Sequence, residues 1–256
     1  MKKEINVIGV IPARYASTRL PVKLLQNLCG KSILRWTWES ASGARLLDKL
    51  IVACDHPEIE KEAKKIGAEV VNTSDKHTSG TDRIAEAIRD IDAKLVINIQ
   101  ADEPLMHPSV IDSLVQEMLT AKDLPMATVK KKIEEKNQID NPNIVKVICD
   151  KFDFAIYFSR LPIPYYRNKN KNGNLGTSYS PYYKHLGIYA YSKDFLYTFK
   201  NLPVSQLEKA EKLEQLRALE AGYEIKVIET HFDSFGIDTS DDLYEAEKVL
   251  MQKGYA

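Results

Sequence analysis

Five basic side chains occupy an N-terminal window that contains no acidic residue. From Ile5 through Trp38 there is no Asp or Glu, although the chain of 256 residues carries 36 basic and 36 acidic side chains. The basic residues of this window are Arg14, Arg19, Lys23, Lys31 and Arg35. In an otherwise neutral chain, this local positive charge suits a polyanion such as a triphosphate. Charge alone leaves open the alternative of a solvated basic connection.

Two familiar phosphate-binding loops are missing from this window. Gly30-Lys31-Ser32 resembles the end of a Walker A motif, but Leu25 stands where the first glycine of that motif belongs. The first predicted strand is not followed by G-x-G-x-x-G, the main mark of a dinucleotide-binding dehydrogenase fold. We therefore expect the loop to bind phosphate with side chains more than with glycine amides.

Asp102 and Asp238 are the candidate ligands of a divalent cation. Asp102 follows the apolar run from Leu95 to Gln100, and Asp238 precedes the last predicted helix. Magnesium is usually held by one or two carboxylates together with substrate phosphates and water, so these two acids could complete a site with a bound triphosphate. Each acid has a plainer alternative. Asp102 could be an Asx-turn residue, and Asp238 could stabilise the helix N-terminus.

Further polar residues are candidates for substrate recognition. The segment Ser79 to Arg83 opens a predicted helix whose free amides and hydroxyls could meet a nucleotide base or phosphate. Ser79 or Thr81 could equally be a simple helix cap. The remaining candidates, each of which alone would more often be structural, are Arg160, His185, Glu214 and Gln215. The five histidines show no metal-binding spacing.

Alternating strands and helices must position these residues. Strands are predicted at Ile5 to Ile11, Leu50 to Cys54, Glu69 to Asn72 and Leu95 to Gln100. Helices are predicted at Ile33 to Leu47, at Ile59 to Ile66, from Ser79 onward and from Pro108 through Met118. Because the strands are almost wholly apolar, the pattern predicts a mainly parallel sheet covered on both faces. The basic loop and Asp102 then lie at the carboxyl edge of that sheet, where ligands bind.

The second half of the chain predicts an antiparallel addition to the sheet, or a dimer-forming lobe. Its predicted strands are Asn143 to Cys149, Phe154 to Ser159, Leu186 to Tyr191 and Ile225 to Ile228. Thr239 and Asp242 have capping-box spacing before the last helix. Arg167 to Pro181 is rich in Asn, Lys, Gly, Ser and Tyr, which predicts a mobile loop over a site or a surface excursion.

The composition narrows the class of protein. Balanced charge gives no indication of nucleic acid or an anionic membrane surface as a partner. Cys29, Cys54 and Cys149 are widely spaced and odd in number, which predicts reduced, mostly buried thiols and argues against disulfides or structural zinc. The first apolar run is too short for a signal peptide, and no stretch reaches the length of a membrane span. We therefore expect a soluble cytoplasmic enzyme.

Together these segments resemble the 3-deoxy-manno-octulosonate (KDO) cytidylyltransferases, also called CMP-KDO synthetases, over nearly the whole chain. The resembling segments are IPARYASTRLPVK (11–23), TSDKHTSGTDR (73–83), NIQADEPL (98–105), YFSRLPIPYYR (157–167), KHLGIYAY (184–191), LEKAEKLEQLRALE (207–220) and GIDTSDDL (236–243). The resemblance implies an α/β, Rossmann-like nucleotidyltransferase fold with a mainly parallel sheet flanked by helices and a small antiparallel lobe for dimerisation and sugar binding. We expect one domain, with a nucleotide-binding part at about 1–120, the lobe at about 121–230 and a C-terminal turn and helix at 231–256.

The resemblance also implies a reaction and a set of site residues. CMP would pass from CTP to the anomeric hydroxyl of KDO, in a magnesium-dependent homodimer that serves lipopolysaccharide or capsule assembly. Arg14 and Lys23 would contact the CTP phosphates, and Ser17 and Arg19 would help to form their loop. The base and ribose would be recognised around Thr73, Ser74, Ser79, Gly80 and Gln100. Asp102 and Asp238 would bind magnesium, while Gln100, Arg160, His185, Glu214 and Gln215 would face the sugar.

Two positions depart from the family pattern. Val22 stands where the family usually has Gly between Pro and Lys, and Ala101 replaces the Gly of Gln-Gly-Asp-Glu-Pro. Both changes remove backbone freedom, so a positive φ at Val22 would be strained. Two alternatives to the expected reaction stay open. One is a cytidylyltransferase for another acidic sugar, such as 8-amino-KDO or a nonulosonate, and the other is an inactive nucleotide-binding regulatory protein.

Overall fold

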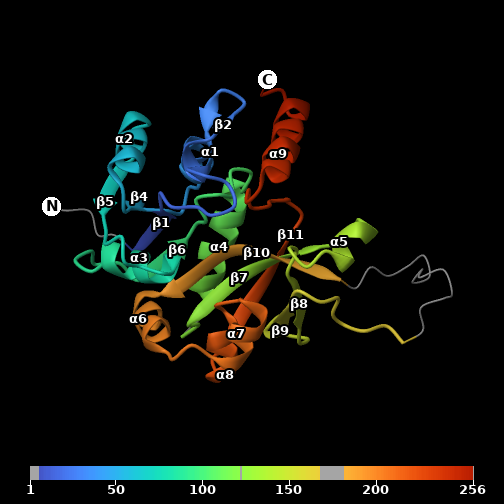
Figure 1. Cartoon of the computed structure of the whole chain (residues 1–256). Coiled ribbons are helices and arrows are strands. Elements are labelled where there is room, and N and C mark those ends of the chain that lie inside the picture. The colour runs from blue at the N-terminus through green and yellow to red at the C-terminus, as the bar shows by residue number, and fades with distance from the viewer. Residues whose placement is uncertain (1–5, 122, 168–181, 256) are drawn as a thin grey trace.

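The fold was analysed in a computed structural model, in which residues 6–121, 123–167 and 182–255 are described. A nine-stranded sheet runs through the molecule (Figure 1). Along its main path the strands follow in the order β11 (Ile225–Thr230), β7 (Met126–Lys132), β10 (Tyr183–Ser192), β6 (Leu95–Asn98), β1 (Val7–Ala13), β4 (Lys49–Cys54) and β5 (Glu69–Asn72). The four strands β6, β1, β4 and β5 are parallel, as predicted, whereas β10 is antiparallel to both of its neighbours β6 and β7.

A hairpin of β8 (Lys146–Cys149) and β9 (Ala155–Ser159) extends the sheet sideways from β10. Strand β10 and this hairpin are antiparallel to their neighbours, as expected for part of the second half of the chain. Strand β11, also predicted in that half, instead pairs parallel with β7. A separate two-stranded ribbon, β2 (Asn27–Leu28) with β3 (Lys31–Ser32), leads from the N-terminal loop into the first helix.

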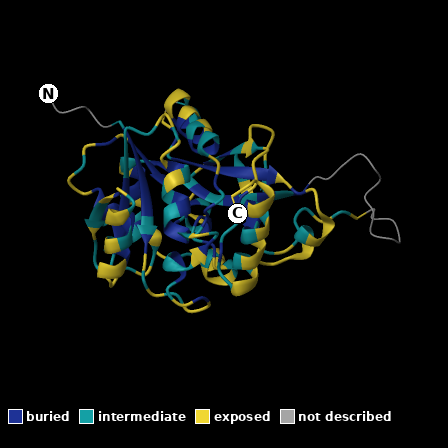
Figure 2. Ribbon diagram, turned by 90° about the horizontal axis from the view of Figure 1, so that it is seen from above, coloured by how far each residue is buried: buried dark blue, intermediate teal, exposed yellow. Residues whose placement is uncertain are grey.

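Helices cover both faces of the sheet. The helices are α1 (Ile33–Ala41), α2 (Pro57–Lys65), α3 (Gly80–Ala87), α4 (Pro108–Thr120), α5 (Lys136–Asp140), α6 (Lys193–Asn201), α7 (Gln206–Glu211), α8 (Leu216–Glu220) and α9 (Ser240–Gln252). Side chains of β1 alternate between two cores, because successive residues of a strand point to opposite faces. Val7 and Ile11 pack with α1, α2, α4 and α9, whereas Ile8 and Val10 pack with α3, α6 and α8. The buried strands therefore lie between two helical layers, whose exposed residues face outward (Figure 2).

The structure differs from the sequence-based elements in two places that have clear causes. The helix predicted to reach Leu47 ends at Ala41, because the backbone amides of Arg45 and Leu46 bond to the Asp112 carboxylate instead of continuing the helix. Strand β7 was missed, since its three consecutive lysines indicate a solvated segment. Two of them, Lys130 and Lys131, are buried and paired with acids.

Three smaller expectations can also be compared with the structure. Cys29, Cys54 and Cys149 are free thiols, but only Cys54 is fully buried, so the prediction of mostly buried thiols is wrong for Cys29 and Cys149. The segment predicted as a loop, Arg167 to Pro181, lies outside the described residues after its first member. Within the described ranges, no helix combines the length and the apolar character that crossing a membrane would need.

Candidate active site

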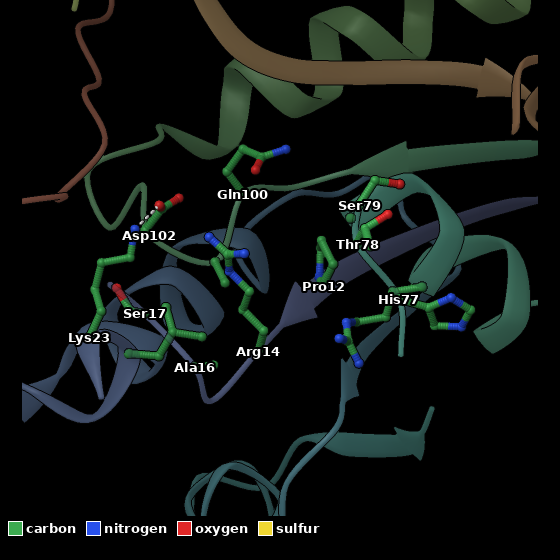
Figure 3. Close-up of a pocket in the computed structure, with 14 residues that line it drawn as sticks. Pro12, Arg14, Ala16, Ser17, Lys23, His77, Thr78, Ser79, Gln100 and Asp102 are labelled. Atoms are coloured by element: carbon green, nitrogen blue, oxygen red, sulfur yellow. Dashed lines mark hydrogen bonds and ion pairs between the residues drawn. The ribbon is translucent and has the colours of Figure 1, made fainter. Parts of the chain in front are cut away.

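A pocket lies at the carboxyl edge of the parallel strands β1 and β6 (Figure 3). Its lining comes from three segments that are distant in the sequence. These residues are Pro12, Arg14, Ala16, Ser17, Lys23, Leu24, His77, Thr78, Ser79, Gly80, Arg83, Gln100, Ala101 and Asp102. In Figure 3, Lys23 and Asp102 meet on one side, Thr78 and Ser79 lie on the other, and Arg14 lies between these two sides. The fold thus brings together the basic loop, the Asp102 turn and the start of α3.

The N-terminal loop reaches the pocket through a strained residue. Val22 has φ 49° and ψ 39°, which is left-handed backbone, and it immediately precedes a 3-10 turn at Lys23–Leu25. The Leu25 amide donates to the Val22 carbonyl at 2.9 Å and closes that turn. Val22 therefore has the left-handed backbone that would be strained for a residue with a Cβ, and the next residue, Lys23, lines the pocket. Ala101, by contrast, is not among the described residues with positive φ.

Lys23 connects the two acids that were predicted to bind a metal. Its ammonium contacts the Asp102 carboxylate and donates to Asp238 Oδ1 at 2.9 Å. Arg19 reaches the other oxygen of Asp238, Oδ2, at 2.7 Å. Burial lowers the pKa of Lys23, but the attraction of Asp102 and Asp238 outweighs burial and raises that pKa above its ordinary value. Lys23 is therefore a charged ammonium placed between two carboxylates.

This arrangement bears on whether the site suits magnesium. A single cation, the Lys23 ammonium, already lies between Asp102 and Asp238, so their oxygens converge on one small positive charge. Among residues 6–121, 123–167 and 182–255, no group of three or more His, Cys, Asp or Glu side chains is arranged to hold a metal ion. Two carboxylates without further protein ligands are the usual protein share of a magnesium site that is completed by substrate phosphates and water. The donor set fits magnesium on that basis.

Two bonds hold the acid-bearing segments together. The Ile237 amide donates to the Asp102 carbonyl at 2.9 Å, and the Ser234 hydroxyl donates to Glu103 Oε2 at 2.8 Å. Both Glu103 and Ser234 are buried. Burial raises the pKa of Glu103 to about 7, although its hydrogen bonds oppose that rise.

Arg83 organises the other side of the pocket. It is 3% exposed and pairs with Asp55 at 2.7 Å. The same guanidinium donates to Thr73 Oγ1 at 2.6 Å and to the Ser74 carbonyl at 3.3 Å. Asp55 also accepts the Tyr15 amide at 2.9 Å, so the buried pair fastens the N-terminal loop to the segment around Thr73. Thr73 and Ser74 themselves stand behind the pocket lining.

The start of α3 is a capped helix end that also lines the pocket. Ser79 is the N-cap and accepts the Asp82 amide, as the capping alternative proposed. Ser79 and Gly80 also line the pocket, as does His77, which pairs with Glu86. Glu86 in addition accepts the Ser74 amide at 3.0 Å. A capped helix start is thereby held with its first turn facing the cavity.

Glu214 and Gln215 lie close behind this helix. Glu214 accepts a hydrogen bond from Thr81 Oγ1 at 2.8 Å, and burial raises its pKa. Gln215 is 3% exposed, and its amide nitrogen Nε2 has no hydrogen-bond partner within the described residues. An unsatisfied buried donor is costly, so this amide is available to a ligand oxygen.

The remaining two predicted sugar contacts are not in the pocket lining. His185 Nε2 bonds to Thr128 Oγ1 at 2.8 Å, and burial lowers the pKa of His185 to about 3, so its ring is neutral. Arg160 donates to the carbonyls of Glu211 and Pro142, at 2.8 and 3.0 Å. In this structure both side chains are engaged with the lobe around β8, β9 and β10.

Sequence reasoning missed several residues that the structure brings to the site. Arg83 and His77 line the pocket, while Asp55, Glu103 and Ser234 fix the segments around it. Arg83 stands at the end of the Ser79 to Arg83 segment, whose position at a helix start was the available signal. The contact of Ser234 with Glu103 spans 131 positions, so no local pattern could indicate it.

Comparison with known proteins places this geometry among nucleotidyltransferases. The sequence model of the family described as Cytidylyltransferase matches residues 8–227. A 3-deoxy-manno-octulosonate cytidylyltransferase of Fusobacterium nucleatum is 46% identical over 249 residues, which cover 97% of this chain and 98% of the relative. The enzyme of the same name from Solibacter usitatus is 44% identical over 245 residues, covering 96% and 94% of the two chains.

Solved structures give the same comparison in three dimensions. A CMP:2-keto-3-deoxy-manno-octonic acid synthetase complexed with CTP superposes with a TM-score of 0.88 at 37% identity, over 97% of this chain and 99% of the other. A cytidylyltransferase from Leptospira borgpetersenii, at 15% identity and a TM-score of 0.61, shares the fold. The predicted α/β nucleotidyltransferase fold is confirmed by the synthetase.

Proposed function

Because the chain belongs to the 3-deoxy-manno-octulosonate cytidylyltransferase family, we propose that it transfers CMP from CTP to the anomeric hydroxyl of KDO and releases pyrophosphate. One observation carries the proposal at the level of the site. A pocket that contains Arg14, Ser17 and Lys23 adjoins the paired carboxylates Asp102 and Asp238. Phosphoryl-type transfer needs such positioning and charge neutralisation more than it needs covalent catalysis.

The basic loop would hold the triphosphate. Arg14 and Lys23 are the cations of the pocket lining that come from this loop, and the Ser17 hydroxyl lies beside them. Lys23 now contacts Asp102 and Asp238, so it can reach a phosphate oxygen only by lengthening or breaking those contacts. Arg19, paired with Asp238, supports the same segment from outside the lining. The anomeric hydroxyl would then attack the α-phosphorus in line as pyrophosphate leaves.

Asp102 and Asp238 would hold magnesium together with the phosphates of CTP. When bound, magnesium would neutralise charge on the triphosphate and help to orient it for displacement. The two acids contribute by presenting oxygens from opposite ends of the chain, one after β6 and one before α9. Their present contact with an ammonium supports this assignment, since both carboxylates already accept one shared cation.

The base and ribose would be recognised between Gln100 and the start of α3. Gln100, Ser79 and Gly80 line the pocket, and Arg83 holds Thr73 and Ser74 behind it.

The acidic sugar would bind beyond Gln100, toward the residues at the end of α7 and the start of α8. The free amide of Gln215 and the buried carboxyl of Glu214 offer a donor and an acceptor for sugar oxygens. His185 would contribute as a neutral ring. Arg160 would contribute by exchanging its carbonyl partners, Glu211 and Pro142, for the sugar carboxylate.

The antiparallel lobe would form a homodimer. Its exposed apolar side chains include Phe152, Ile156, Leu161 and Tyr165, with exposed fractions from 58% to 84%. Strand β9 pairs with β8 alone in the described sheet and so presents a free edge beside these residues. Apolar residues gathered on a free edge suit association with a second copy. We place the enzyme in the cytoplasm, where CTP is available, and its product in lipopolysaccharide or capsule assembly.

One assay tests the proposed function. Purified protein is incubated with CTP, magnesium and a panel of acidic sugars that includes KDO, 8-amino-KDO and sialic acid, and pyrophosphate release is measured. We expect KDO to be the preferred substrate and CMP-KDO to be the product by mass. Preference for another sugar would reassign the substrate, and absence of release with every sugar would contradict the enzyme assignment.

A further inference from the structure

We propose that Glu103 and Ser234 form a positioning pair that aligns Asp238 with Asp102 for metal binding. This inference rests on the proposed function, because it assigns to these two residues a role in that site. Glu103 and Ser234 are buried, and neither is among the residues that line the pocket. They act through the two acids.

The Glu103 carboxylate is the meeting point of three segments. Glu103 directly follows Asp102 in the turn after β6, and its side chain is buried. Its carboxylate accepts the Ser234 hydroxyl at 2.8 Å, and its other oxygen, Oε1, lies against the backbone of Gly187 in β10. Ser234 itself belongs to the connection between β11 and α9 and is 3% exposed. One side chain therefore joins the turn after β6, the middle of β10 and the segment that leads to Asp238.

Gly187 makes this junction possible. A Cβ added at Gly187 would lie 2.8 Å from Glu103 Oε1, which is closer than such atoms approach. The register of β10 against β7 also shifts between Leu186 and Tyr189, so the strand bulges where it meets the carboxylate. Glycine at this position has a specific reason: the Glu103 carboxylate needs the space that a side chain would fill.

The segment that leads to Asp238 is held by two hydrogen bonds, and the bond from Ser234 to Glu103 is one of them. Ser234 bonds to Glu103, and Ile237 bonds through its amide to the Asp102 carbonyl at 2.9 Å. Ile237 is fully buried in the core, immediately before Asp238. Because these two hydrogen bonds are only three residues apart, they restrict movement of the segment that precedes Asp238. A metal that needs oxygens from both acids depends on that alignment, since partners of the ligands commonly set metal affinity.

The test compares variants that leave every charge and every pocket residue in place. Ser234→Ala removes one hydroxyl, and Gly187→Ala forces the Glu103 carboxylate to move. Mn2+ is titrated into the enzyme–CTP complex without sugar, and binding is followed by water-proton relaxation. We expect each variant to weaken Mn2+ binding by roughly tenfold, the lower end of the range for partners of metal ligands. The magnesium concentration for half-maximal turnover should rise by a similar factor, while the KM for CTP at saturating magnesium changes less than about twofold.

Ser159→Ala provides the matched control. Ser159 is also a buried serine, 2% exposed, whose hydroxyl donates to a glutamate, Glu211, at 2.6 Å. It lies in β9, away from the acids, so its loss should lower stability by a comparable amount without weakening Mn2+ binding. A shift in Mn2+ affinity that also occurs in Ser159→Ala would show a general loss of rigidity and overturn the proposal.

Two further outcomes would be decisive. If Ser234→Ala and Gly187→Ala fold and bind Mn2+ as tightly as the unchanged enzyme, the positioning role is wrong while the proposed function stands. If the unchanged enzyme–CTP complex binds no Mn2+ beyond that of free CTP, the metal assignment of Asp102 and Asp238 fails, and this proposal fails with it.

Discussion

The Lys23 ammonium donates a hydrogen bond to Asp238 Oδ1 at 2.9 Å, although the two residues are 215 positions apart in the sequence. Lys23 contacts Asp102 as well, and its side chain is only 10% exposed. The Lys23 ammonium, from the basic N-terminal loop, thereby joins the two acids. A divalent cation at the carboxylate oxygens that Lys23 contacts would compete with this ammonium.

Replacing Lys23 by Met should therefore let metal bind without nucleotide. The acids would lose their internal counter-ion, and Mn2+ affinity in the absence of CTP should rise by about tenfold, which corresponds to about 1.4 kcal/mol. Electron paramagnetic resonance of free Mn2+ measures this directly. Arg19→Met is the control, because Arg19 also pairs with Asp238 but is 59% exposed and therefore screened by solvent. If Lys23→Met and Arg19→Met raised Mn2+ affinity equally, the change in net charge alone would explain the result, and the specific role of Lys23 would be contradicted.

Asp102→Asn should remove turnover while leaving the fold intact. The substitution keeps the side-chain volume and removes one carboxylate, so pyrophosphate release should fall on the order of a thousandfold, or about 4 kcal/mol in the barrier. Circular dichroism and the urea midpoint check that the protein stays folded. Asp238→Asn should behave alike. Near-normal pyrophosphate release by either variant would contradict its assignment as a metal ligand.

Val22→Gly should make the protein more stable. Val22 has φ 49°, and left-handed backbone costs a residue with a Cβ roughly 1–2 kcal/mol, whereas glycine loses about 0.5–1 kcal/mol through its freer unfolded state. The free energy of unfolding in urea should rise by about 1 kcal/mol. Val204→Gly is the matched control, since Val204 is half exposed and is not among the positive-φ residues. That variant should be less stable, and a Val22→Gly protein that is equally destabilised would disprove the strain.

The neutral state of His185 should make stability depend on acid. Burial lowers the pKa of His185 to about 3 from an ordinary value of 6.5, so the unfolded chain takes up a proton between these pH values and the folded chain does not. This contribution to stability is complete above pH 6.5 and is lost as pH falls toward 3, by up to about 1.4 kcal/mol per pH unit. Urea unfolding of the protein and of His185→Gln between pH 4 and 7 measures it. If the free energy of unfolding depended on pH in the same way in both proteins, His185 would not have the lowered pKa.

Much of the α/β architecture could be predicted from local pattern. The prediction of a strand at Glu69 to Asn72 is confirmed to the residue, and the capping box of Thr239 and Asp242 forms as its spacing indicates. This strand and this capping box depend on residues that are close together in the sequence, so local sequence patterns can predict them. Strand β7 was missed because Lys130 and Lys131 pair with Asp153 and Asp233, partners that only the folded chain brings near.

The sequence by itself determined the family, the basic loop and the two acids as candidates, because residue types and their order are sufficient for these. Whether the acids meet depended on tertiary structure, since the segment after β6 and the segment before α9 are far apart in the chain and are joined by the hydrogen bond from the Ile237 amide to the Asp102 carbonyl. Tertiary structure also placed Lys23 between Asp102 and Asp238, and it gave Glu103 a partner in Ser234. Hydrogen bonds and ion pairs act over a few ångströms of space, and distance along the chain does not reveal them.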